Sequence, residues 1–101
     1  MKVHTESVQF KADKKLVEFI NRKVGKLDQY FDRIIHVDVK LRLENAGQVK
    51  DKVAEVRLEV PGQRLFAKEV SKTFEKSISE VVENLRRQLT KYKEKLRPQS
   101  V

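Results

Sequence analysis

The stretch that decides the fold is residues 35–44, which read IHVDVKLRLE. Apolar and polar residues alternate along it, and the apolar ones share one face of an extended chain: Ile35, Val37, Val39, Leu41 and Leu43. A period of two is that of a β-strand, and one apolar face opposite one polar face is typical of a strand buried on one side. The stretch therefore predicts a long strand in a sheet that has one face in water.

Two further strands are predicted downstream of this stretch. Turn-forming residues at 45–48 precede a second alternating run, in which Ala54, Val56, Leu58 and Val60 share a face. Pro61 and Gly62 form the next turn, and residues 64–69 then predict a last strand with Leu65 and Ala67 inward. Because the connections are short, these neighbouring strands are expected to be antiparallel.

Helical periodicity lies on both sides of the strands. After a short predicted strand at residues 2–8, apolar residues recur at helical spacing, at Leu16, Ile20, Val24, Leu27 and Phe31. Asp13 is suited to cap this helix, and Gly25 inside it indicates close packing at that point. A longer apolar stripe follows Ser71, at Phe74, Ile78, Val81, Val82, Leu85, Leu89, Tyr92 and Leu96. Ser71 or Thr73 can be its N-cap, and Pro98 ends it.

The predicted order is β-α-β-β-β-α, an α+β fold with two layers. The helix between the first two strands implies a right-handed crossover and a parallel pair. One apolar face per strand and one stripe per helix place both helices on one face of a four-stranded sheet. We expect a single domain over residues 1–97 and a short frayed tail over residues 98–101.

The composition narrows the functional classes. The 101 residues carry 23 Lys and Arg against 15 Asp and Glu, which gives a net charge of +8 and a pI near 9.8. Such a balance is typical of proteins that bind nucleic acids or other polyanions. The chain has no cysteine, which excludes thiol catalysis and disulfides. Without a secretory signal or an apolar run long enough to span a membrane, it is expected in the cytoplasm.

The sequence gives little support for an enzyme. His4 and His36 stand on strands without metal-ligand spacing or a nucleophilic partner, and the three glycines are isolated. Asp38, Glu55 and Glu59 on the open sheet face are explained by cross-strand pairing with neighbouring bases. We therefore expect no catalytic residue, no metal site, no cofactor and no small-molecule substrate.

The placement of the basic residues predicts a phosphate-binding surface on the helices. In the first helix, Lys11, Lys15, Arg22 and Lys26 lie opposite the apolar stripe with Glu18 as the only acid in that row, and Lys23 lies on one flank. Residues 86–97 carry six basic residues against one acid, and of these Arg86, Arg87, Lys91 and Lys93 border the second stripe. A soluble helix usually has a mixed charged face, and cations near a helix C-terminus also interact well with its dipole. These effects explain part of the bias, but they account less well for six basic residues against one acid within twelve residues. With few exposed aromatics expected, recognition of the RNA backbone is favoured over base readout.

The second helix also resembles a known family. Residues 85–93, LRRQLTKYK, are similar to the L-x-R-Q-L-x-K-x-K signature of the ribosome hibernation-promoting factor and ribosome-associated inhibitor family, in its short form. Residues 22–27, RKVGKL, and Leu65-Phe66-Ala67 with the helix entry after it also look like this family. The resemblance runs from about residue 2 to residue 95.

The resemblance implies a fold similar to double-stranded-RNA-binding domains and a position on the small ribosomal subunit. Members occupy the channel of messenger RNA and of the A- and P-site transfer RNAs, where they silence and protect idle ribosomes under stress or in stationary phase. It implies RNA contacts by Lys23, Lys26, Arg87 and Lys91, to which the helical positions add Arg22, Arg86 and Lys93. The expected partner is the small subunit and its ribosomal RNA, bound by a monomer.

Two alternatives share part of this pattern. A module for another structured RNA would use the same basic helices without preferring the small subunit. A protein-interaction domain would use the exposed sheet face or the edge strand at residues 64–69, and its binding would depend little on salt.

Overall fold

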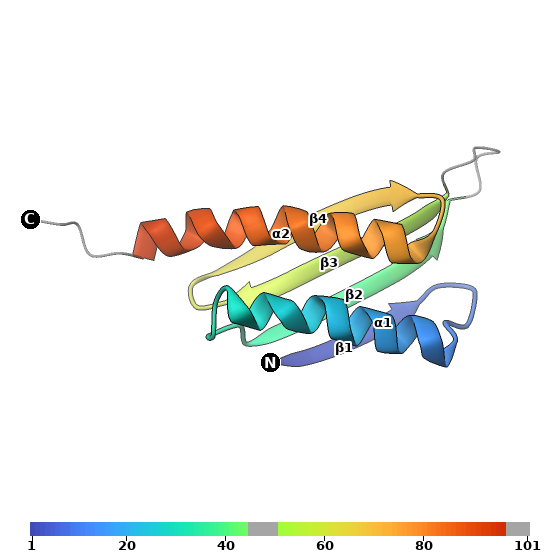
Figure 1. Ribbon diagram of the computed structural model, residues 1–101, viewed down its shortest axis with the longest axis horizontal. Helices are drawn as coiled ribbons and strands as arrows, with labels where there is room; N and C mark the ends of the chain where they lie inside the picture. Colours follow the sequence, from blue (N-terminus) through green and yellow to red (C-terminus); the bar gives the residue numbers. More distant parts are fainter. Residues whose placement is uncertain (45–50, 97–101) are drawn as a thin grey trace, which may run out of the picture.

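A four-stranded sheet lies behind two helices in the computed structural model, which describes residues 1–44 and 51–96 (Figure 1). The elements in chain order are β1 (Lys2–Ser7), α1 (Lys14–Gly25), the 3-10 helix η1 (Lys26–Gln29), β2 (His36–Leu43), β3 (Lys52–Val60), β4 (Gln63–Ser71) and α2 (Phe74–Leu96). The predicted α+β order is confirmed. The turn expected at 45–48, the ending at Pro98 and the tail at 98–101 lie outside the described residues, so the domain limits stay a prediction.

The strands are arranged in the order β1-β2-β3-β4. β1 and β2 are parallel, with Val3 opposite Val37, whereas the pairs β2–β3 and β3–β4 are antiparallel. The register places Val39, Val56 and Ala67 side by side across the sheet. The parallel pair follows from the α1 crossover, as the sequence predicted, and the tight turn at Pro61 and Gly62 forms the last hairpin.

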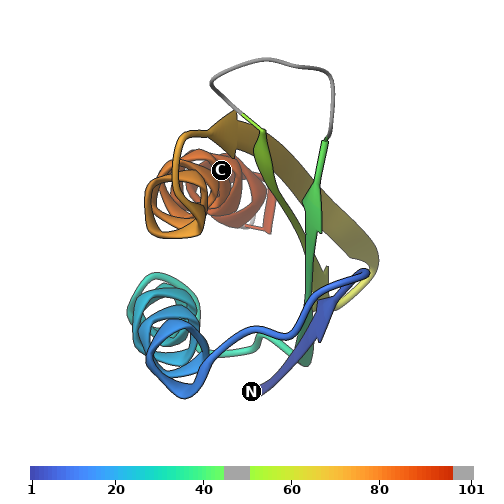
Figure 2. The same ribbon diagram turned by 90° about the vertical axis from the view of Figure 1, so that its right-hand side faces the viewer.

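Both helices cover the same face of the sheet, and the other face is open (Figure 2). Along most of β2 and β3 the inner side chains alternate with exposed or half-buried ones, although Val53 and Ala54 at the start of β3 are both buried. Val37, Val56 and Leu58 have no exposed surface. Ile20 and Val24 of α1 and Leu85 and Leu89 of α2 are equally buried against them. The core therefore lies between the sheet and the two apolar helix stripes that the sequence predicted.

The helix starts follow the predicted capping. The Asp13 carboxylate accepts a hydrogen bond from the Leu16 N–H at 2.8 Å, and the Thr73 hydroxyl accepts one from the Lys76 N–H at 3.1 Å. Of the two candidates for the second cap, Thr73 is therefore the one used, while Ser71 is buried in β4. The first helix is shorter than its periodicity indicated, since α1 ends at Gly25 and a 3-10 turn continues it.

Three apolar residues expected in the core are exposed instead. Ile35, Leu43 and Leu96 keep 55%, 47% and 44% of their surface in contact with water. Ile35 lies before the start of β2 and Leu43 ends it, and Leu96 lies one helical turn beyond Tyr92, at the end of α2 (Figure 1). The apolar pattern in the sequence thus continues past the region in which the sheet and the helices bury each other's apolar side chains.

Side chains of α2 bind the outer edge of the sheet. The Gln88 side chain donates to the carbonyl oxygen of Phe66 at 2.8 Å, and the Tyr92 hydroxyl donates to that of Pro61 at 2.6 Å. Asn84 donates to the Glu69 carboxylate at 3.3 Å. These bonds fix which side of α2 faces β4 and therefore which side faces α1.

The prediction that Gly25 allows close packing is wrong. A Cβ atom added at this position would meet no atom within 4 Å outside its own helix and chain neighbours, and the backbone is helical, with φ −60° and ψ −25°. Gly25→Ala should therefore raise the free energy of unfolding, by about 0.5–1 kcal/mol, because alanine loses less backbone entropy on folding. Urea denaturation followed by circular dichroism measures the change, and a lowered stability would contradict it.

The core stripe of α2 supports a second prediction. Leu89→Ala should lower the free energy of unfolding by about 2–5 kcal/mol, because Leu89 has no exposed surface and the surrounding core cannot close the cavity fully. Leu96→Ala on the same helix is the matched control and should cost less than about 1 kcal/mol. Equal effects of the two substitutions in the same denaturation experiment would refute the assignment of Leu89 to the core.

Candidate nucleic-acid interface

The two helices lie side by side and run in the same direction, so their C-terminal ends point toward the same end of the molecule, where α2 extends past the end of α1 (Figure 1). The predicted RNA-binding residues stand in the last turns of α1, at the start of η1 and in the second half of α2. We call them the basic helix ends: Arg22, Lys23, Lys26, Arg86, Arg87, Lys91 and Lys93. The fold thus brings together two groups of cations that are some sixty residues apart in the chain.

On α1 these cations surround an aromatic ring. The guanidinium of Arg22 lies 5.5 Å and the ammonium of Lys23 lies 5.9 Å from the centre of the Phe19 ring. Phe19 is half-buried and packs against the core. Lys26 follows Lys23 by three residues, which keeps it on the same side of the helix. Cation–π contact therefore holds two of the three cations on the side of α1 that carries Phe19.

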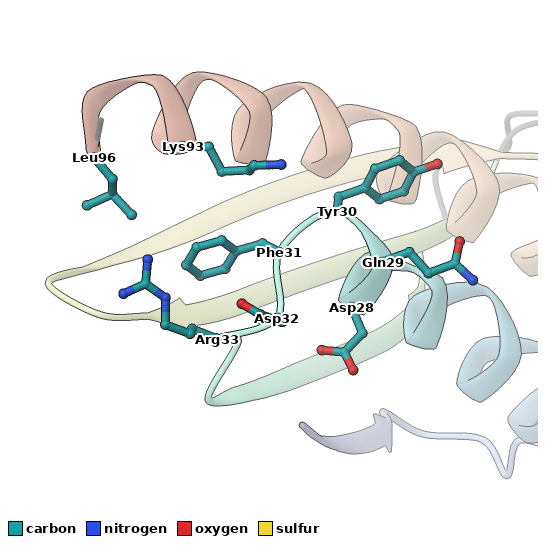
Figure 3. A pocket seen from close by; sticks show the side chains of 8 residues that line it. All are labelled: Asp28, Gln29, Tyr30, Phe31, Asp32, Arg33, Lys93 and Leu96. Atoms are coloured by element: carbon teal, nitrogen blue, oxygen red, sulfur yellow. The ribbon is translucent and has the colours of Figure 1, made fainter. Parts of the chain in front are cut away.

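On α2, Arg86 and Lys93 lie on the side that faces the end of α1. The Arg86 guanidinium lies 5.9 Å from the centre of the Tyr30 ring, just after η1. Lys93 lines a hollow together with residues 28–33 (Figure 3). Both helices are right-handed and run in the same direction. Viewed along the helix axis, the side of α1 that faces α2 is therefore reached by turning one way from its buried stripe, and the side of α2 that faces α1 by turning the other way. The Phe19 side of α1 and the Arg86 side of α2 therefore face each other.

Arg87 and Lys91 lie on the other flank of α2. At 100° per residue they lie on the same side of the helix as Asn84 and Gln88, whose side chains bind β4. Both are exposed, and their charges point away from the core. Arg87 and Lys91 therefore form a separate slope toward the sheet edge, on the opposite flank of α2 from Arg86 and Lys93.

One acid stands among the arginines of α2. Glu83 accepts two hydrogen bonds from Arg86, and its Oε1 lies 3.6 Å from a guanidinium nitrogen of Arg87. The hydrogen bond from Arg86 lowers the pKa of the Glu83 carboxyl, and the same contact raises the pKa of Arg86. Because the carboxyl pKa lies below its usual range of about 4, Glu83 stays ionised at neutral pH and offsets part of the arginine charge.

The open sheet face is also charged, and some of its acids are paired with neighbouring bases. Arg42 Nε donates to the Glu55 carboxylate at 2.9 Å, and Asp38 lies directly opposite Arg57. His36 Nε2 lies 2.8 Å from the Asp38 carboxylate on the same strand. The cross-strand pairing predicted for these acids is therefore observed for Glu55, whereas the hydrogen-bond partner of Asp38 is on its own strand. The basic helix ends, with Glu83 as the acid paired to their α2 arginines, are therefore the better polyanion surface.

Sequence reasoning missed three residues around this surface. Glu83 could have been found from the sequence. It stands three residues before Arg86 and four before Arg87, and side chains at these spacings contact each other on a helix. Tyr30 and Arg33 follow η1, where helical periodicity no longer says which way a side chain points. Their positions depend on the loop, whose Tyr30 and Phe31 N–H groups both donate to the Leu27 carbonyl.

A two-layer α+β fold that gathers cations on two neighbouring helices defines a class of small basic proteins suited to a polyanionic partner. Within that class, the sequence from residue 3 to residue 97 matches the family described as Sigma 54 modulation protein / S30EA ribosomal protein. The chain belongs to this family. The resemblance seen in residues 85–93 is thereby confirmed.

Individual relatives agree with this assignment. The ribosome hibernation promoting factor of Escherichia coli strain K12 is 38% identical over 82 residues, which are 81% of this chain and 82% of that protein. The protein of the same name in Pseudomonas putida strain KT2440 is 27% identical over 95 residues, 94% of this chain and 89% of that protein.

Two solved structures share the fold. A ribosomal subunit interface protein from Coxiella burnetii superposes with a TM-score of 0.82 at 20% identity, covering 92% of this chain and 98% of that one. The N-terminal domain of Thermus thermophilus Protein Y superposes with a TM-score of 0.73 at 23% identity, covering 90% and 94%. In the part of the chain that the structure describes, no helix is long and apolar enough to cross a membrane.

The pairing of Glu83 with two arginines leads to a prediction for the interface. Glu83→Gln should tighten binding to structured RNA, by about threefold to tenfold at moderate salt, because Arg86 and Arg87 then have their full charge available for phosphates. Glu6→Gln, which makes the same charge change at an exposed position on the open sheet face, is the matched control. Fluorescence anisotropy with labelled RNA measures both, and equal affinities of the two variants would contradict the placement of the interface.

Proposed function

We propose that this chain is a ribosome hibernation factor, which binds the small ribosomal subunit in the cytoplasm and silences and protects idle ribosomes. The basic helix ends contact ribosomal RNA, and the domain occupies the channel of messenger RNA and of the A- and P-site transfer RNAs. The observation that carries the proposal is that the family match and the surface charge agree. A member of a ribosomal protein family carries its predicted RNA-binding cations on the last turns of α1, the start of η1 and the second half of α2, and these two helices lie side by side.

The contacts proposed are made mainly to phosphates. Five of the seven cations are exposed and two are half-buried, so their charged groups are accessible from outside the molecule. Lysine and arginine neutralise phosphates and release counterions, which provides affinity without reading sequence. Folded ribosomal RNA offers phosphates in a fixed arrangement, which the rigid spacing between the two helices can match.

Inhibition follows from occupancy. A protein lodged where messenger RNA and transfer RNA bind excludes both by steric overlap, so no catalytic group is required. The affinity must then depend on salt, since each phosphate contact adds to the counterions released. Seven contacts would lose on the order of a thousandfold or more in affinity between about 50 and 200 mM salt.

Binding to ribosomes tests the proposal directly. Purified small subunits are sedimented through sucrose with the wild-type protein or with Arg87→Glu combined with Lys91→Glu. The wild-type protein should co-sediment at low salt and be released at high salt, whereas the double variant should remain unbound. Both substituted residues are exposed, so the variant should keep its thermal stability.

The matched control for this experiment is Lys2→Glu combined with Lys68→Glu. It makes the same change in net charge on the open face of the sheet, where both lysines are exposed. This control should still co-sediment. If it dissociates and the helix variant stays bound, the sheet is the docking face. A wild-type protein that ignores small subunits but binds other structured RNA would replace the ribosome proposal with the second function.

A further inference from the structure

We infer that the hollow beside the ends of η1 and α2 binds one unpaired nucleotide, whose base stacks on Tyr30. The inference rests on the proposed function and adds to it, because phosphate contacts do not require an unpaired base. The hollow is lined by residues 28–33 together with Lys93 and Leu96, and has a volume of about 510 Å³ (Figure 3). This volume falls within the range usual for small-molecule sites.

Tyr30 is the residue that indicates a stacking site. Its side chain is 39% exposed although it follows a well-ordered turn, and its N–H donates to the Leu27 carbonyl at 3.0 Å. Tyr92, the other tyrosine, is buried and its hydroxyl is bonded to Pro61. An aromatic ring held at a fixed position with a large exposed surface can stack an unpaired base.

The surroundings of the ring agree with a nucleotide. The Arg86 guanidinium lies over the Tyr30 ring, and the Lys93 amine points toward that ring across the hollow (Figure 3). On the far side the Arg33 guanidinium lies 5.2 Å from the centre of the Phe31 ring. Phosphates on either side of a stacked base can therefore meet cations at both ends of the hollow.

The polar groups of the hollow exclude another occupant. Asp28, Gln29 and Asp32 line it along with the cations. Carboxylates accept hydrogen bonds from the N–H groups on the Watson–Crick edge of a base, while the cations of the hollow are available to its phosphates. In a duplex this edge is already paired and the base faces are stacked. The occupant that fits is thus an unpaired nucleotide of RNA.

The test measures single-stranded binding separately from subunit binding. The probe is a short single-stranded RNA that carries the fluorescent base 2-aminopurine, titrated with wild-type protein and with Tyr30→Leu. The wild-type protein should quench the fluorescent base on stacking. Tyr30→Leu should abolish the quenching and weaken binding by about fivefold to a hundredfold, the range found when a stacking aromatic is lost.

Two variants control the test. Tyr30→Phe keeps an aromatic ring and should restore quenching and affinity. Phe66→Leu removes an aromatic ring with 47% exposure from the open sheet face and should leave both unchanged. The loss in Tyr30→Leu should be the same factor at low and high salt, because stacking releases no counterions, whereas a lost phosphate contact would lower the salt dependence.

The outcomes separate this inference from the proposed function. If Tyr30→Leu binds and quenches the single strand as the wild type does, while the wild type still co-sediments with small subunits, only the stacking site is wrong. If Tyr30→Phe fails as completely as Tyr30→Leu, the hydroxyl and not the ring is the determinant, and the stacking proposal is again overturned. If the wild type does not bind small subunits, the proposed function fails whatever Tyr30 does.

Discussion

The valine and leucine side chains on the inner faces of β2 and β3 require cover from water, and two helices provide it. Each such side chain contributes about 1.5–3 kcal/mol when it is fully buried, so this one-sided burial is the main stabilising interaction of the molecule. Because the parallel β1–β2 pair makes α1 a crossover and β4 leads directly into α2, both helices start from the same end of the sheet. Their C-terminal ends therefore point the same way, and the position of the proposed RNA-binding surface is a consequence of how the core is covered.

Gathering cations at one end has an energetic cost, which several contacts reduce. The C-terminus of a helix has a partial negative charge, and here two such ends stand beside the basic residues. Glu83 pairs with two arginines, while the rings of Phe19 and Tyr30 each hold cations near their faces. All of these contacts are at or near the surface, where ion pairs are weak. They reduce the repulsion among the cations of the free protein, and in the proposed complex they can be exchanged for contacts with phosphates.

The sequence predicted the elements well because burial on one face leaves a periodic pattern. The alternation around Val39 and the stripe through Leu85 were read correctly. The sequence was a poorer guide to the residues at which helices and strands end. Ile35, Leu43 and Leu96 continue an apolar pattern beyond the covered region, and the turn after Gly25 changes the helix type without changing the spacing. For the interface, the sequence indicated which helices carry the charge, but the pairing of Tyr30 with Arg86 depends on the loop conformation. Whether the seven cations contact RNA remains a prediction.

The hydrogen bonds from α2 to the sheet edge also affect how the protein behaves at high concentration. An outer strand normally offers a row of free backbone groups, which another chain can pair with to extend the sheet and begin aggregation. Gln88 and Tyr92 already occupy two carbonyl oxygens, at Phe66 in β4 and at the turn that precedes it. The helix that carries the cations thus takes up part of the hydrogen-bonding capacity at this edge of the sheet, which lowers the tendency of a second chain to pair with β4.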